Sequence, residues 1–195
     1  MTIVEAAEVR QRLTMPVCID LMRTSLRELE AGNYTQPLRS IALLPGGEKF
    51  GFMPACLGDC FGAKVLSAFP QNAGTKYPSH IGYVLLFEGE HGSFLGMADA
   101  AVITEIRTGA VSGVATDLLA RPDAHRLAII GAGAQGRSHL AAMTVVRDIH
   151  SVTVYDQTLR RPAATVRRWR KNLVFRSPLQ TVSGRRYATL TSSAP

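Results

Sequence analysis

The chain has 195 residues and a net charge of +7, and hydrophobic residues make up 46% of it. This length predicts one large or two small globular domains, and the absence of 18 consecutive apolar residues argues against a membrane span. The N-terminal "MTIVEAAEVRQ" lacks the apolar core of a signal peptide, and the three cysteines contain no C-x-x-C pair. We therefore expect a cytoplasmic protein with reduced thiols.

The positive charge is concentrated at the C-terminal end of the sequence. Residues 157–195 contain nine Arg and Lys residues and no Asp or Glu, so the first 156 residues have a net charge of 7 − 9 = −2. A basic segment can bind nucleic acid, but these arginines are not interleaved with the aromatic residues that a base-stacking surface needs. We predict neither a nucleic-acid nor a membrane partner.

The first part of the chain predicts two helices followed by several short strands. Apolar residues at helical spacing predict helices over Val4–Leu13 and Met15–Glu30. Short apolar runs bounded by Gly and Pro, such as "SIALLP", "GFMPACL" and "GAKVLSAFP", predict strands. "FEGEHGSF" predicts a hairpin turn between Tyr83–Phe87 and Phe94–Met97, and a helix follows over Thr104–Leu119.

The pattern then changes to strand, helix and strand. "RLAIIG" is typical of a short buried strand, Ala134–Arg147 of a helix and "SVTVYD" of a second strand. A β-α-β unit of this kind indicates a parallel sheet. We therefore predict an α/β protein: a mixed α+β substrate and dimerisation domain at residues 1–119, then a partial Rossmann domain with a doubly wound parallel sheet at residues 120–195.

A glycine-rich turn, "GAGAQG", joins the first of these strands to the helix. Gly131, Gly133 and Gly136 match G-x-G-x-x-G, the fingerprint of dinucleotide binding. Gly131 permits a sharp turn, Gly133 lets the backbone approach a pyrophosphate, and Gly136 allows close packing of helix and sheet. The N–H groups at the helix start, including those of Ala134 and Gln135, are expected to face the phosphates.

Asp156 ends the next strand, at the position where a carboxylate binds the ribose hydroxyls. A carboxylate there favours NAD over NADP because it repels a 2′-phosphate, although Arg160 and Arg161 follow closely and keep NADP open. An ordinary role in capping the end of the strand is the alternative for Asp156.

From Met15 to Asp156 the sequence resembles the ornithine cyclodeaminase/μ-crystallin family. The resemblance rests on "MADAAVITEIRTGAVSGVATDLLARPDAHRLAIIGAGAQGRSHLAAM", with support from "FGAKVLSAFPQN" and "SHIGYVLLF". It implies an NAD(P)-dependent enzyme that acts on small amino or imino acids, dimeric through the domain that does not bind nucleotide. Its name-giving activity, ornithine cyclodeamination, converts L-ornithine to L-proline and ammonia through an imine, and it is the activity we expect.

The resemblance leaves other activities open. Ketimine or cyclic imine reductases and alanine dehydrogenases belong to the same family. The family also carries an acidic catalytic residue downstream of the glycine turn, and no residue of this chain matches it. The resemblance therefore implies a C-terminally truncated member, in which residues 157–195 are divergent or frameshifted, and a catalytically silent dinucleotide-binding protein is a further alternative.

Three cationic residues match the family's binding set for the substrate carboxylate: Arg39, Lys64 and Arg107. Paired, directional donors are what a carboxylate in a water-poor cleft requires. The resemblance also implies pocket roles for Ser79 and His80, and an ordinary structural role is the alternative for His80. It implies cofactor contacts for Thr191 and its neighbours Thr189 and Ser192. The remaining histidines, His91, His125, His139 and His150, have no metal-ligand spacing, so we predict no metal site.

Overall fold

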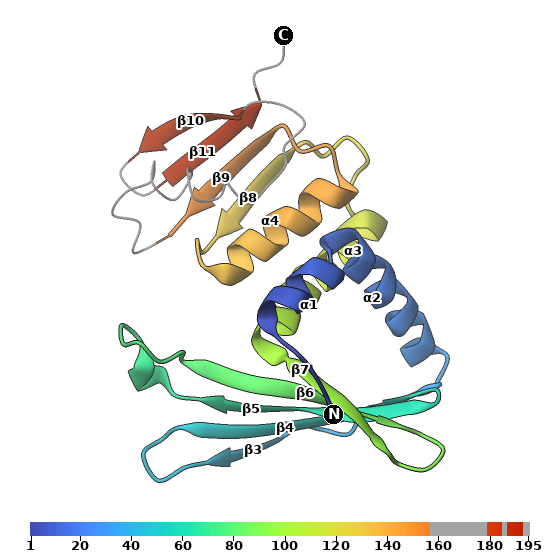
Figure 1. The fold of residues 1–195 in the computed structure, drawn as a ribbon. Coiled ribbons are helices and arrows are strands. Elements are labelled where there is room, and N and C mark those ends of the chain that lie inside the picture. Colours follow the sequence, from blue (N-terminus) through green and yellow to red (C-terminus); the bar gives the residue numbers. More distant parts are fainter. Residues whose placement is uncertain (157–178, 185–186, 193–195) are drawn as a thin grey trace. The chain divides into compact units, whose positions relative to one another are not determined.

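The computed structural model describes residues 1–156, together with the backbone of residues 179–184 and 187–192 (Figure 1). By its contacts the chain divides into two compact units. The first contains Met1–Thr14 and Arg23–Thr104, and the second contains Met15–Met22 and the chain from Glu105 onward. The predicted division into domains at residues 119 and 120 stays a prediction.

The first unit is built on a mostly antiparallel sheet with the order β1-β7-β6-β5-β4-β2, in which β3 also pairs with β4. Only the β1–β7 pairing is parallel within this sheet. Its strands are β1 (Thr2–Val4), β2 (Tyr34–Thr35), β3 (Ser40–Leu43), β4 (Lys49–Leu57), β5 (Cys60–Ala68), β6 (His80–Glu88) and β7 (Phe94–Asp99), with a short 3-10 helix η1 (Pro70–Asn72) after β5. The strands predicted from the Gly- and Pro-bounded apolar runs are therefore present.

The structure corrects the start of the first predicted helix. Thr2–Val4 forms β1, which pairs with Gly96–Ala98 of β7 and so satisfies its backbone N–H and C=O groups in the ladder. α1 consequently spans Ala6–Arg12. The second predicted helix is confirmed, because α2 spans Met15–Glu30.

The turn of the β6–β7 hairpin is organised around one carboxylate. Glu88 accepts backbone N–H groups from Glu90, His91 and Ser93, at distances of 2.7 to 3.1 Å. Hydrogen bonds from N–H groups stabilise the charged form of a carboxyl group. The backbone N–H of Ser93, and next that of His91, lower the pKa of Glu88 from 4.5 to about 2.

α3 spans Ala100–Leu119, and so begins before the predicted Thr104. The reason is Asp99, whose carboxylate accepts the N–H of Val102 at 2.7 Å. An Asp in this position satisfies one of the N–H groups that a helix start leaves without a partner, which fixes the beginning of the helix.

The second unit contains the predicted β-α-β segment. β8 (Arg126–Ile130) leads into α4 (Ala134–Val146), and β9 (Ser151–Tyr155) pairs with β8 in parallel (Figure 1). α4 ends one residue before the predicted Arg147. The core between this helix and the two strands consists of Ile129, Leu140, Val152 and Val154.

Small residues bring α3 and α4 into close contact within this unit. Gly109 of α3 faces Ser138 of α4 so closely that a Cβ at residue 109 would overlap the serine. The Ser138 hydroxyl donates to the carbonyl oxygen of Glu105 at 2.6 Å. One turn along, a Cβ at Gly113 would lie 3.2 Å from the Cβ of Ala142. The two helices therefore touch through matched small residues four positions apart.

Arg147 fastens the end of α3 to the end of α4. Its guanidinium donates to the carbonyl oxygens of Thr116, Asp117 and Ala120 at 2.9 to 3.0 Å and forms an ion pair of 3.1 Å with the Asp117 carboxylate. The last carbonyls of a helix have no partners within the helix. A cation beside them also interacts favourably with the negative end of the helix dipole. Arg147 thus caps α3 from the neighbouring helix.

The strand that pairs with β9 on its other side, β11, runs against the parallel pair. β11 (Tyr187–Ser192) is antiparallel to β9, and β10 (Leu179–Gly184) is antiparallel to β11. Only two residues separate β10 from β11, and a connection that short joins antiparallel strands only. The doubly wound sheet is thus represented by its first parallel pair. The arginine-rich stretch 157–178 lies outside the described residues.

No helix among the described residues is both long enough and apolar enough to cross a membrane.

The Glu88 carboxylate makes the hairpin sensitive to acid. Because its pKa in the folded chain lies below the ordinary value, ionised Glu88 stabilises the hairpin fully above pH 4.5, and this contribution is lost as the pH falls from 4.5 towards 2. We expect Glu88→Gln to speed amide hydrogen exchange at His91 and Ser93 at neutral pH. The variant should also remove the loss of hairpin stability that the wild type shows as the pH falls below 4.5. Glu90→Gln is the control. Equal exchange rates in Glu88→Gln and the wild type would contradict this role.

Candidate functional site

The glycine turn lies where β8 ends, beside the end of the parallel strand β9. Gly131 adopts φ +100°, in a region that residues with a side chain rarely occupy. Its N–H donates to the carbonyl oxygen of Tyr155 at 2.7 Å. The sharp turn predicted for Gly131 is present, and it is fixed to the end of the neighbouring strand.

The other two glycines of the motif have opposite surroundings. A Cβ at Gly133 would meet no atom within 4 Å, so the backbone there borders open space. A Cβ at Gly136 would overlap the carbonyl oxygen of Gly131 and lie 3.3 Å from Ile129. Gly133 therefore leaves room for a ligand next to the backbone, and Gly136 permits the close packing of α4 on β8.

Asp156 holds the turn from the side of β9. Its carboxylate accepts the N–H of Ala132 at 2.7 Å. The carboxylate thus supports the conformation of the glycine turn, and it lies at the edge where a ribose would be bound. The ribose role remains a prediction.

The start of α4 is open to solvent and electrostatically suited to an anion. Gly133, Ala134 and Gln135 are exposed, no side chain caps the helix, and its first turn carries no acidic residue. The first N–H groups of a helix and its dipole together attract negative charge. The residues present therefore meet the requirements of a dinucleotide pyrophosphate, namely open space, N–H donors and positive potential.

Lys64 lies in the middle of β5, between Met53 of β4 and Val84 of β6 in the strand register. Its ammonium group is within 3.4 Å of the Thr104 hydroxyl on α3. Burying part of a lysine among apolar strand residues is costly unless its charge finds polar partners. Thr104 is one such partner, and the sequence did not identify it.

Arg107 is exposed on α3, three residues after Thr104. Residues with this spacing lie on the same face of a helix. Within the second unit, Arg107 acts on the buried Cys18 of α2: burial raises the pKa of the Cys18 thiol, and the charge of Arg107 partly opposes this rise. The Cys18 thiol therefore loses its proton less readily than an exposed cysteine does. The reduced state of the cysteines stays a prediction.

Arg39 and Ser79 lie in the connections of the first unit. Arg39 is exposed and directly precedes β3, and Ser79 directly precedes β6, where its carbonyl oxygen accepts the N–H of Phe69 at 2.8 Å. His80, the first residue of β6, is exposed and pairs with Ala68 in the sheet. Arg39, Lys64 and Ser79 thus belong to the first unit, and Arg107 to the second.

Thr191 pairs with Ser151, at the amino end of β9, whereas the glycine turn adjoins Tyr155 at the other end of that strand. The antiparallel direction of β11 produces this result, since a parallel strand would end beside the turn. The strand pairing therefore gives the predicted cofactor contact of Thr191 no support. The same holds for the predicted Thr189 and Ser192 contacts.

The model of the ornithine cyclodeaminase/mu-crystallin family matches residues 1–184. The chain belongs to this family. The Delta(1)-pyrroline-2-carboxylate reductase of Bacillus cereus is 31% identical over 161 residues, which cover 81% of this chain and 50% of that protein. The L-lysine cyclodeaminase of Streptomyces rapamycinicus is 36% identical over 143 residues, covering 71% and 42%.

A solved structure of a family member also resembles this chain. The Thermococcus litoralis Delta(1)-pyrroline-2-carboxylate reductase, in complex with NADH and L-proline, matches with a TM-score of 0.79 and 31% identity. The match covers 88% of this chain and 53% of that one. The chain thus spans roughly half the length of these relatives.

The different surroundings of the glycines make a sharp test of the turn. Gly133→Val should leave the thermal midpoint of unfolding nearly unchanged, because the residue has φ −74° and borders open space, yet it should weaken NADH binding at least tenfold by filling the ligand's place. Gly136→Val should instead lower the midpoint, because its side chain would overlap Gly131. Calorimetry for binding and circular dichroism for unfolding separate the two effects. Unchanged NADH affinity in Gly133→Val would contradict the assignment.

Proposed function

We propose that the chain binds the dinucleotide of an NAD(H)-dependent enzyme. The enzyme reduces a cyclic imino acid, such as Δ1-pyrroline-2-carboxylate, to the corresponding amino acid. The observation that carries the proposal is the open backbone at Gly133 beside the uncapped start of α4. The reaction class is supported by the reductases of B. cereus and T. litoralis, each 31% identical to this chain.

The glycine turn holds the pyrophosphate in this proposal. The N–H groups of Ala134, Gln135 and Gly136 donate to it, and Asp156 accepts from the ribose hydroxyls, which favours NAD over NADP. When bound, the nicotinamide supplies a hydride. The turn itself orients the cofactor and contributes no acid or base.

Lys64 and Arg107 bind the carboxylate of the imino acid, with Arg39 and Ser79 as further contacts. Support comes from the place of Lys64 in the middle of an apolar strand, where its ammonium group finds the Thr104 hydroxyl at 3.4 Å as a polar partner. A guanidinium can donate two parallel hydrogen bonds to a carboxylate, and a lysine adds a compact charge. The two cations would fix the ring of the substrate and balance its negative charge.

The same two cations, Lys64 and Arg107, would bind the substrate carboxylate in a second reaction. This reaction is the cyclodeamination of L-ornithine or L-lysine to a cyclic amino acid and ammonia. The 36% identity to an L-lysine cyclodeaminase favours keeping this candidate. The two reactions differ in a measurable way, because only cyclodeamination releases ammonia and leaves the oxidation state of the cofactor unchanged after each turnover.

We also propose a homodimer that forms through the first unit. One face of its sheet carries large apolar side chains that are exposed in the single chain. By strand register this face includes Phe50, Phe52, Phe61, Ile81 and Tyr83, each 38% to 48% exposed. Large exposed apolar side chains gathered on one face of a sheet are typical of a protein–protein contact.

The proposal is tested by NADH oxidation with Δ1-pyrroline-2-carboxylate, alongside ammonia release from L-ornithine and L-lysine with NAD⁺. Lys64→Met should reduce kcat/KM for the imino acid about thirtyfold, the equivalent of about 2 kcal/mol for a lost charged hydrogen bond. The NADH dissociation constant should not change. Lys76→Met is the matched control, since Lys76 stacks on Tyr77 at the surface.

Ammonia release without imine reduction would replace the reductase by the cyclodeaminase. A failure to bind NADH would contradict both.

A further inference from the structure

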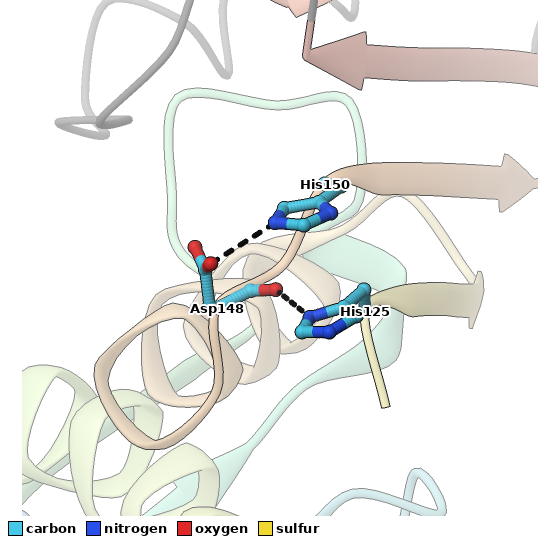
Figure 2. Close-up of side chains that lie close together, drawn as sticks. All are labelled: His125, Asp148 and His150. Atoms are coloured by element: carbon cyan, nitrogen blue, oxygen red, sulfur yellow. Dashed lines mark hydrogen bonds and ion pairs between the residues drawn. The ribbon is translucent and has the colours of Figure 1, made fainter. Parts of the chain in front are cut away.

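Two histidines occupy matching positions at the amino ends of the parallel strands of the second unit. His125 directly precedes β8 and His150 directly precedes β9, and the register of the two strands pairs their first residues, Arg126 and Ser151. The N–H of His150 donates to the carbonyl oxygen of His125 at 2.8 Å, which continues the ladder by one step. The rings consequently stack, with centroids 4.3 Å apart and planes 7° from parallel (Figure 2).

The segment that leads into β9 adds a carboxylate to the two rings. Asp148 and His150 are two residues apart, and their side chains contact each other on the same side of this segment. Ile149, between them, packs against the core of Ile129, Leu140, Val152 and Val154. The partly buried isoleucine therefore fixes Asp148 and His150 on the outer side, where their side chains are 71% and 52% exposed.

Asp148 contacts both histidines (Figure 2). Its carboxylate lies 3.0 Å from Nε2 of His150, and its backbone carbonyl oxygen lies 2.7 Å from Nδ1 of His125. A carbonyl oxygen can only accept, so neutral His125 carries its proton on Nδ1 and a lone pair on Nε2. A bond from one ring nitrogen to a carbonyl oxygen is the usual way in which a metal-binding imidazole is oriented.

We propose that His125, Asp148 and His150 form a binding site for a borderline transition-metal ion of the zinc, nickel or copper class. One nitrogen of each ring and one carboxylate oxygen lie within 4.8 Å of one another. Two imidazoles and a carboxylate suit these ions, whereas magnesium and calcium prefer oxygen ligands alone. The side chains of His150 and Asp148 are exposed and can rotate to bring their donor atoms to the ion. Water would occupy the remaining coordination positions.

The site is separate from the cofactor site in the same unit. The three residues lie at the amino ends of β8 and β9, whereas the glycine turn lies at the carboxyl ends of these strands. The inference therefore does not depend on the proposed function. Since the ligands come from the connection before β8 and the connection before β9, a bound ion joins the two and stabilises the unit by mass action.

The test is calorimetric titration of the full chain with Zn²⁺, and with Mg²⁺ for comparison. We expect saturable binding of one Zn²⁺, no Mg²⁺ binding, and a rise in the thermal midpoint of unfolding with Zn²⁺. His150→Ala and Asp148→Asn should each lower the Zn²⁺ affinity by about tenfold or more and remove the thermal shift. Both residues are exposed, so the variants should fold, which their midpoints without metal will check.

Two control variants separate this site from other zinc ligands of the chain. His91→Ala removes an exposed histidine whose ring nitrogen lies 3.9 Å from the Glu90 carboxylate. Cys56→Ser removes an exposed thiol. Neither should change the affinity. Absence of saturable Zn²⁺ binding, equal affinity in His150→Ala and the wild type, or loss of binding in Cys56→Ser would overturn the proposal.

Discussion

The hydrogen bond from the N–H of Gly131 to the carbonyl oxygen of Tyr155 is the contact on which the dinucleotide site depends. It ties the turn after β8 to the end of β9, and the bond between Ala132 and Asp156 ties the next residue to the same strand end. These two hydrogen bonds fix the direction in which the chain leaves the sheet after β8. α4 then begins with its free N–H groups and positive dipole end at the open space beside Gly133.

Close packing behind the turn holds that geometry. Gly136 brings α4 onto β8, and the pairs Gly109–Ser138 and Gly113–Ala142 bring α3 onto α4 with little room for adjustment. Well-packed interiors transmit displacement rather than absorb it. A larger side chain at any of these glycines would therefore move the start of α4. The small residues of "RTGAVSGVATD" serve the cofactor site without lying in it.

The sequence predicted most of this unit because its signals are local. The motif "GAGAQG", the two β-branched strands and the Gly and Pro punctuation each act over a few residues, so the β-α-β segment and the tasks of its glycines could be predicted. Contacts set by strand pairing could not. The alignment of His125 with His150 follows from the register of β8 and β9, and Lys64 meets Thr104 across forty residues of chain.

Other differences have equally definite causes. The start of α3 moved to Ala100 because Asp99 caps it, although "ADAAV" does contain that signal. Val4 joined a strand because β7 offered it a ladder partner, which helical periodicity does not reveal. A cue for the histidine cluster was present in the sequence, since one histidine directly precedes each of two strands expected to be parallel neighbours.

The most direct test of the account is a nuclear magnetic resonance titration of the ¹⁵N-labelled chain with NADH, following the backbone amides of Ala134, Gln135 and Gly136. We predict that these three signals shift together and saturate, while the amides of His125 and His150, at the other end of the strands, stay in place. Saturable NADH binding that leaves the three amides unshifted would contradict the claim that the glycine turn holds the pyrophosphate.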